Sequence, residues 1–323
     1  KIVIKLAAAF EAVGIVLLLF AFVPQFGAEG VWVSVFTAIS AFCNAGFDLF
    51  GRFGDYSSLV PYVNNYYVQA VIMFMIMAGG LGFMVWVELA EYRKKRRLSL
   101  HAKVVLQFSV IFWVGGAVLL ALLEWSNPRT MGGLSVPGKI MAALFQSVST
   151  RTAGMNTIDL AACSPISKLL MSVLQFIGAA PGSTGGGVKV TTFAVLILTI
   201  RSVAQGRDDC VIGGHHIESK TVYRALTIIV IGAVAAFGSA VVVYYNTAET
   251  VSVIDCIFES CSAFGTVGLS VGVTGQLNTG AKLLYMACMF MGRVGPVSLA
   301  ISLTAKPDDN KRKVLPVGHI NVG

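Results

Sequence analysis

Three related strings of the chain end in glycine, and their residue types suit the binding of a cation by backbone oxygen atoms. The strings are Asn44-Ala45-Gly46, Thr152-Ala153-Gly154 and Thr266-Val267-Gly268. Glycine adopts backbone angles that strain other residues, so successive carbonyl oxygens in such a string can point at one axis. Carbonyl oxygens in this arrangement replace the hydration shell of the ion in potassium channels. The alternative is that the glycines only allow close packing, since glycine is common in membrane helices.

The placement of the three glycines favours the first interpretation. They lie 108 and 114 residues apart, and each follows a short apolar segment, at 31–42, 139–149 and 253–263. Similarity at a regular period indicates a protein built from repeated units. A helix that stops inside a membrane leaves its last carbonyls unpaired and carries partial negative charge at that end. Three such ends directed at one axis are expected to form a filter for cations.

A second candidate site interrupts an apolar stretch of 35 residues at 166–200. Its middle, 178–187, contains five glycines and Pro181, and in a helix interior glycine costs about 1 kcal/mol and proline about 3 kcal/mol. A broken segment at membrane depth is expected to line a cavity, and a structural kink is the alternative. A phosphate-binding loop is excluded, because Val188 separates the last glycine from Lys189 and Val190 stands where Ser or Thr is needed.

Two arginines lie where a charge is unexpected. Arg293 is near the middle of an apolar segment, where a charge is costly and is usually functional or paired. We expect it to line a cavity, and a salt bridge with Glu11 is the alternative. Arg151 adjoins the second string, so its side chain is expected to point behind that string and to brace it. The side chains of Cys43 and Asn44 are expected to pack behind the first string.

The elements that position these sites are apolar segments of two lengths. About 20 apolar residues cross a bilayer as a helix, and segments of that length or longer occur at 2–23, 66–87, 104–123, 166–200, 223–245 and 281–303. The three short segments cannot cross and are expected to be re-entrant or buried helices. Ser252 and Asp255 resemble a capping box, and Pro137 suits the first turn of the middle short helix. The order is long, short, long, three times.

The composition excludes several classes of protein. Of 323 residues, 56% are hydrophobic and 12% are charged, whereas soluble domains average about 25% charged residues. High hydrophobicity also excludes disorder. The six cysteines form no CxxC pair and the four histidines lie in polar connections, so no metal-ligand pattern is present. No catalytic constellation lies within a span, and no enzymatic function is predicted.

The charge distribution predicts the orientation. Net charge is +8, with 16 Lys and Arg residues on the side of the connections between repeats and six on the side of the short segments. The connections are therefore expected to be cytoplasmic and the filter side external, which explains the basic excess without nucleic acid. Eight acids give the external side a net charge of −2, which favours cations there. The densest basic cluster, 93–97, either anchors the chain at anionic lipid or binds a cytosolic partner.

These residues resemble the Trk/Ktr/HKT potassium transporter superfamily. The three strings look like its filter sequences, the stretch from Gly178 to Lys189 looks like an intramembrane loop of its third repeat, and 291–296 with the polar tail ending at Gly323 is similar to the Ktr branch. The resemblance covers essentially the whole chain. It implies an all-α membrane protein of helix–pore-helix–filter loop–helix units around a central pore. Three units are visible and four are expected, the first of them before Lys1.

The resemblance implies a role for each site. Potassium is the transported ion, and the backbone of the three strings binds it. The implied function is potassium uptake across the bacterial inner (plasma) membrane through a channel-like pore, with sodium dependence in some members. The implied gate consists of Gly178, Pro181, Gly182, Ser183, Thr184, Gly185, Gly186, Gly187, Lys189 and Arg293.

The resemblance also implies partners. These are a second copy of the chain in a homodimer, with one pore in each protomer, membrane lipid, and a cytosolic KtrA-like ring of nucleotide-binding regulatory subunits. The chain itself has no G-x-G-x-x-G motif opening a helix, so it is expected to bind no nucleotide.

The expected organisation follows from the segments. Pore-loop repeats occupy 1–87 (the second of the family's four), 104–200 (with a broken second helix) and 223–303, cytoplasmic connections occupy 88–103 and 201–222, and a cytoplasmic tail occupies 304–323. A secondary cation transporter with broken helices and alternating access is the main alternative. It shares the breaks at mid-membrane but requires moving halves and stoichiometric coupling.

Overall fold

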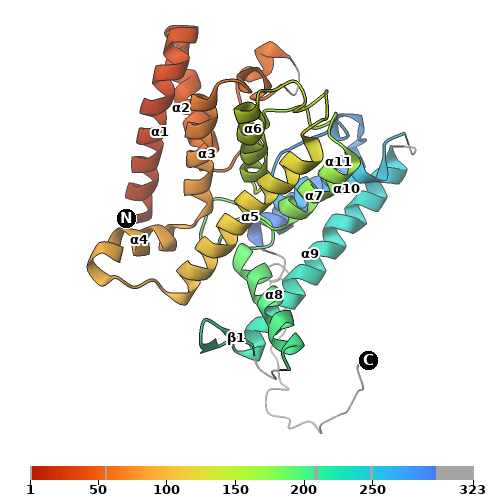
Figure 1. The fold of residues 1–323 in the computed structure, drawn as a ribbon. Coiled ribbons are helices and arrows are strands. Elements are labelled where there is room, and N and C mark those ends of the chain that lie inside the picture. Colours follow the sequence, from red (N-terminus) through yellow and green to blue (C-terminus); the bar gives the residue numbers. More distant parts are fainter. Residues whose placement is uncertain (1, 55–56, 207–209, 248–249, 296–323) are drawn as a thin grey trace.

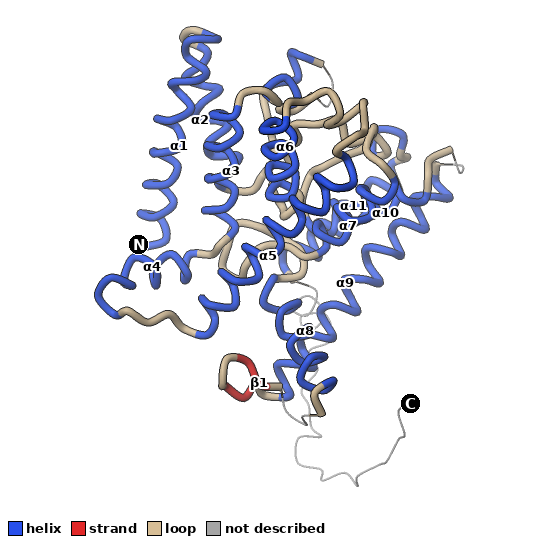
Figure 2. Tube along the Cα trace, viewed as in Figure 1, coloured by secondary structure: helices blue, strands red, loops and turns tan. Residues whose placement is uncertain are grey.

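The fold is almost entirely helical. The computed structural model describes residues 2–54, 57–206, 210–247 and 250–295, and its helices are arranged as in Figure 1. Figure 2 shows that regular structure other than helix is confined, in the described part, to one small hairpin. The all-helical fold class is therefore confirmed. The minor elements are β1 (Val211–Ile212), β2 (His215–His216), η1 (Phe50–Phe53), η2 (Val60–Tyr62) and η3 (Thr274–Gln276).

The first unit consists of α1 (Ile2–Phe26), α2 (Glu29–Phe42), α3 (Tyr66–Gly80) and α4 (Phe83–Lys95). The short helix α2 matches the predicted segment at 31–42. The expected continuous helix at 66–87 is wrong, because α3 and α4 are bent by 98° at the break between them. The carbonyls of Gly79 and Gly80 accept hydrogen bonds from the 177–189 loop, and Gly82 has φ +88°. The helix breaks because the loop takes over the carbonyls that the next turn would use.

The second unit consists of α5 (Leu100–Glu124), α6 (Val136–Ser149), α7 (Pro165–Phe176) and α8 (Val190–Ala204). Ser99, Ser135 and Ser164 cap the first three of these helices by accepting from the backbone N–H three residues further on. Pro137 lies in the first turn of α6, as predicted. The segment at 177–189 is not helical, which confirms the predicted interruption.

The third unit consists of α9 (Ser219–Asn246), α10 (Val253–Gly265) and α11 (Thr279–Val294). The Ser252 hydroxyl accepts from the backbone N–H of Asp255 at 3.1 Å, which confirms Ser252 as the N-cap. The rest of the predicted last span, including Pro296, and the predicted tail at 304–323 lie outside the described residues.

Apolar helices of spanning length occur in each unit. Among the described residues, α1, α5 and α9 are long and apolar enough to cross a membrane, and the bent pair of α3 and α4 is a fourth candidate. Large apolar side chains on these helices are exposed, among them Phe20, Leu122 and Val234. So many exposed large apolar side chains on helices of spanning length indicate contact with a membrane or a partner.

The short helices lie between the long ones. α2 contacts α1 and α3, α6 contacts α5 and α3, and α10 contacts α9, α11 and α7. In Figure 1 the three units follow one another across the molecule, from α1 to α3 at the left to α9 to α11 at the right. Each short helix after the first therefore also contacts the preceding unit, and this packing brings the strings that follow the short helices toward one another.

Candidate functional site

The three strings share one backbone turn. Each begins with a residue other than glycine in the left-handed region, and φ is 50° at Asn44, 77° at Thr152 and 52° at Thr266. The glycine two positions later is also left-handed in each string, with φ of 74°, 86° and 92°. Residues other than glycine rarely adopt such angles, so their recurrence at equivalent positions shows that the three strings are built alike.

A serine braces each string at both ends. The hydroxyls of Ser40, Ser149 and Ser262 donate to the carbonyl of the residue that follows the glycine, which is Phe47, Met155 or Leu269. The backbone carbonyls of the same serines accept from the residue before the glycine. These serines were not among the residues predicted to form the site. The sequence does contain a pattern that identifies them, because each serine lies four residues after a phenylalanine of its short segment.

The three glycines meet in space although they are far apart in the sequence. A methyl group placed on Gly46 would lie 2.6 Å from the carbonyl oxygen of Ala153 and 3.1 Å from the Cα atom of Gly154. A methyl group on Gly154 would overlap the carbonyl oxygen of Val267. At Gly268 the nearest atom is the Cα of Gly154, 3.8 Å away. The strings thus converge so closely that only glycine fits at two of the positions.

Arg151 lies behind the second string. Its side chain is buried, Nη2 donates to the carbonyl of Gly178 at 2.9 Å, and the guanidinium lies 5.3 Å and 5.8 Å from the ring centroids of Phe112 and Trp113. The predicted bracing position of Arg151 is confirmed by these contacts. The residue also ties the second string to the interrupted segment.

The 177–189 loop is held by backbone hydrogen bonds from several elements. Its two ends pair with each other, since Gly178 donates to Val188 at 2.8 Å and Val188 donates to Phe176 at 3.2 Å. Beyond the contacts with α3 described above, Gly187 donates to the carbonyl of Gly292 on α11 at 3.1 Å. The loop is therefore fixed between α3 and α11.

The middle of this loop contacts the first residue of all three strings. Thr184 Oγ1 accepts from the side chain of Asn44 at 3.0 Å and donates to the carbonyl of Phe42, at the end of α2, at 3.0 Å. A methyl group on Gly185 would overlap the hydroxyl of Thr152, and one on Gly186 would overlap that of Thr266. The prediction that Asn44 packs behind its string is wrong, because its side-chain amide donates to Thr184 of the loop.

Two cationic side chains bind adjacent carbonyls of the loop. Lys189 Nζ donates to Gly185 at 2.6 Å, and Arg293 Nη1 donates to Thr184. No ion pair joins Arg293 to Glu11 within the described residues, and Cys43 Sγ instead lies 3.9 Å from a Glu11 carboxylate oxygen. Arg293 therefore contacts the loop, and the alternative salt bridge with Glu11 is not formed in the described part of the chain.

Two acids that sequence analysis counted toward the external charge are buried and fully engaged. Glu259 is 4% exposed; Oε1 accepts from Ser270 Oγ at 2.5 Å and from the backbone N–H groups of Val271 and Val273, and Oε2 accepts from Thr274 Oγ1 at 2.6 Å. Glu124 is 1% exposed and accepts from Asn127, Thr130 and Ser164. Both carboxylates anchor loops, and Glu259 also lines a cavity of about 420 Å³ beside the third string.

We expect Glu259→Gln to destabilise the protein more than Glu91→Gln. The amide has one acceptor oxygen fewer for the donors of the loop after the third string, and hydrogen bonds to charged groups contribute about 1.5–3 kcal/mol. Glu91 is a matched control because it forms only an exposed ion pair with Lys95, and such pairs contribute about 0–1 kcal/mol. Thermal unfolding in detergent measures both variants, and equal unfolding temperatures would contradict the anchoring role.

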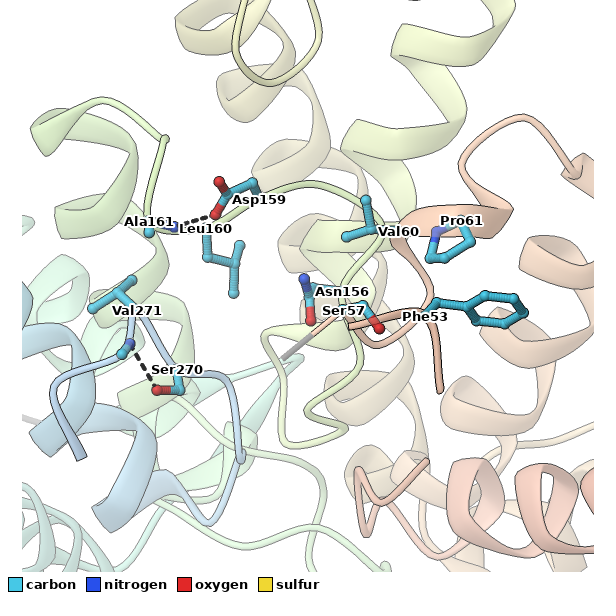
Figure 3. Close-up of a pocket in the computed structure, with 11 residues that line it drawn as sticks. Phe53, Ser57, Val60, Pro61, Asn156, Asp159, Leu160, Ala161, Ser270 and Val271 are labelled. Carbon is cyan, nitrogen blue, oxygen red and sulfur yellow. Dashed lines mark hydrogen bonds between the residues drawn. The ribbon is translucent and has the colours of Figure 1, made fainter. Parts of the chain in front are cut away.

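A cavity of about 480 Å³ lies where the loops that follow the three strings meet (Figure 3). Ser57 comes from the loop of the first unit, Asn156 and Asp159 from that of the second, and Ser270 from that of the third. No group of three or more His, Cys, Asp or Glu residues in the described ranges is placed to hold a metal ion. The candidate site therefore consists of backbone groups where the three strings converge. The 177–189 loop lies against one side of the strings, and the cavity lies among the loops that follow them in the sequence.

Comparisons with known proteins find relatives over almost the whole chain. A family model described as TrkH, cation transport protein, matches residues 1–313. The potassium/sodium uptake protein NtpJ of Enterococcus hirae is 36% identical over 94% of this chain and 67% of its own length. The Ktr system potassium uptake protein B of Vibrio alginolyticus is 37% identical over 95% of this chain and 67% of its own length.

A solved structure has the same fold. The potassium transporter TrkH from Vibrio parahaemolyticus matches with a TM-score of 0.74 at 19% identity, covering 92% of this chain and 62% of that one. The chain spans about two thirds of the length of the relatives that it matches.

Proposed function

The chain belongs to the TrkH family of cation transport proteins, and from this premise we propose that it forms the ion path of a potassium uptake protein. Membership confirms the resemblance that the sequence indicated, including its similarity to a Ktr system uptake protein B. One observation carries the proposal: three strings with the same left-handed turns converge at Gly46, Gly154 and Gly268. Potassium is the proposed ion because both relatives carry it in their names.

In the proposed mechanism a potassium ion exchanges water for backbone carbonyl oxygens of the strings. The C-terminal ends of α2, α6 and α10 precede the strings and supply partial negative charge. The serine braces and the buried Arg151 hold the carbonyls in place, so the site is organised before the ion arrives. No covalent bond is made or broken in the protein.

We propose the 177–189 loop as the gate. It lies against the first residue of every string, and Lys189 and Arg293 bind its carbonyls. In this position the loop obstructs the path, and the two positive charges repel cations that have passed the strings. Opening requires these hydrogen bonds to break.

Thr184→Val tests the link between the loop and the first string. Valine keeps the shape of the side chain but removes the hydroxyl that bonds Asn44 and the carbonyl of Phe42. Each net hydrogen bond contributes about 0.5–1.5 kcal/mol, so losing two should disfavour the closed state by about 1–3 kcal/mol and raise basal potassium flux at least about fivefold. The matched control is Thr199→Val, which removes a hydroxyl from α8 outside the loop. Equal flux in the two variants would contradict the link.

The surroundings of the path follow from the same proposal. The chain is a membrane protein, and we propose the bacterial plasma membrane as its location, with the strings toward the outside and the basic connections in the cytoplasm. A homodimer, a cytosolic KtrA-like regulatory ring and a fourth repeat are further parts of the proposal. Sodium dependence is proposed because one relative is named a potassium/sodium uptake protein.

The experiment that tests the function is ion flux into proteoliposomes containing the full-length protein. We expect rapid influx down a potassium gradient and much slower influx of sodium. Absence of potassium flux, or flux only with obligatory exchange of a second ion, would overturn the pore and favour alternating access.

A further inference from the structure

Two adjoining cavities lie at the ends of the helices that point away from the strings. One, of about 450 Å³, lies between the start of α5, the end of α8 and β1, and the other, of about 460 Å³, lies beside the connection from α4 to α5. Lys103 lines both. We call the two together the basic crevice. Figure 1 shows α4, the start of α5, the end of α8 and β1 at the same end of the molecule.

The charged residues that line the basic crevice are all positive. Arg96, Arg97, Lys103 and Arg201 line it, and no acidic residue does so among the described residues. All four side chains are exposed, and none has an ion pair or hydrogen bond from its side chain within the described part of the chain. Glu88, on the neighbouring α4, is engaged by the backbone N–H and hydroxyl of Ser99. The crevice therefore holds positive charge that the described residues do not neutralise.

The wall of the cavity between α5, α8 and β1 is amphipathic. Gln107, Gln205 and Ser202 supply polar groups, while Val104, Phe108 and Leu198 supply apolar surface. Apolar surface continues along α8, where Ile197 is 40% exposed and Ile200 is 55% exposed. A small soluble anion would use only the polar part of this wall. A molecule with both a phosphate and an aliphatic chain matches all of it.

We propose that the basic crevice binds an anionic phospholipid of the membrane leaflet that it faces. Lys103 and Arg201 receive the phosphate, Gln107 and Gln205 donate to the headgroup, and an acyl chain lies on Phe108 and Leu198 toward the exposed face of α8. Basic pockets between membrane helices bind anionic headgroups in this way. The assignment of the leaflet as the cytoplasmic one rests on the orientation given under the proposed function.

The test measures lipid retention directly. Full-length protein is purified in detergent and mixed with phosphatidylglycerol or with phosphatidylcholine, and native mass spectrometry counts the lipids that remain bound. The double variant Lys103→Gln/Arg201→Gln is compared with Arg93→Gln/Lys94→Gln, which removes the same charge from exposed residues of α4 that do not line the crevice. Thermal unfolding of each variant checks the fold.

We expect the wild type and the control variant to retain phosphatidylglycerol in preference to phosphatidylcholine. The crevice variant should retain it about thirtyfold less well, given the usual contribution of each basic residue near a lipid surface. Equal retention by the two variants, or equal retention of the two lipids, would overturn the proposal. Displacement of the lipid by inorganic phosphate at equal concentration would show that free phosphate is the occupant and would also overturn it.

Unchanged lipid retention together with lost co-purification of a cytosolic protein would show a protein-docking surface instead. Because retention is measured without transport, a negative result leaves potassium uptake to be judged by the flux experiment alone.

Discussion

Deletion of residues 180–186 is expected to raise potassium flux about tenfold or more in the absence of a regulatory partner. A tenfold increase corresponds to about 1.4 kcal/mol less barrier. The deleted residues include Thr184 and Gly185, whose carbonyls bind Arg293 and Lys189, and Gly186, which lies against the third string. The deletion therefore removes the part of the 177–189 loop that contacts the strings.

The deletion is designed so that the chain still closes. Gly178 and Gly187 are in contact, because a methyl group on Gly187 would lie 3.3 Å from the Cα atom of Gly178. The backbone pairing between Gly178 and Val188 is retained on either side of the deletion. Flux is measured in proteoliposomes with protein that elutes as wild type does in size-exclusion chromatography. If well-folded deletion protein conducts no faster than the wild type, the loop is not the gate.

Gly268→Ser is expected to reduce the preference for potassium over sodium while the protein still folds. The structure leaves room for a side chain there, since the nearest atom to an added methyl group is 3.8 Å away, although φ of 92° makes any side chain strained. Gly154→Ser has no such room, because its side chain would overlap the carbonyl of Val267. Overpacking costs about 1–3 kcal/mol, and a strained backbone adds about 1–3 kcal/mol.

The two serine variants should therefore fail in different ways. We expect Gly268→Ser to give folded protein with relaxed selectivity, and Gly154→Ser to give a much lower yield of folded protein. Gly27→Ser is the matched control, because Gly27 also has positive φ, at 59°, but lies outside the strings with no atom within 4 Å of an added methyl group. Ratios of potassium to sodium flux and thermal unfolding measure the effects. Unchanged selectivity in Gly268→Ser would refute the filter assignment.

Features that depend on nearby residues could be predicted from the sequence. The short helices follow from the length of their apolar segments and from caps such as Ser252, and the interruption after α7 follows from its glycines and Pro181. The direction of Arg151 was also predictable, because a positive charge is expected to point away from strings suited to cations. In each case the deciding residues lie close together in the sequence, or the sign of a single charge decides the direction of the side chain.

Features that depend on distant residues could not be predicted. The break after α3 arises because the 177–189 loop, about 100 residues further along the chain, binds the carbonyls of Gly79 and Gly80. Asn44 was misplaced for the same reason, since its partner is Thr184. Glu259 looked like one of several external acids, and only the folded loop at 270–274 reveals four donors around it.

The contacts of the 177–189 loop also determine when, during synthesis of the chain, the loop becomes fixed. Chains are synthesised from the amino end, so the loop leaves the ribosome more than 100 residues before its partners Gly292 and Arg293. Until α11 is inserted, the loop lacks these two contacts. A nascent chain, or one truncated before Gly292, would then hold the proposed gate without these contacts. If the loop is the gate proposed above, insertion of α11 is the step that secures it during biosynthesis.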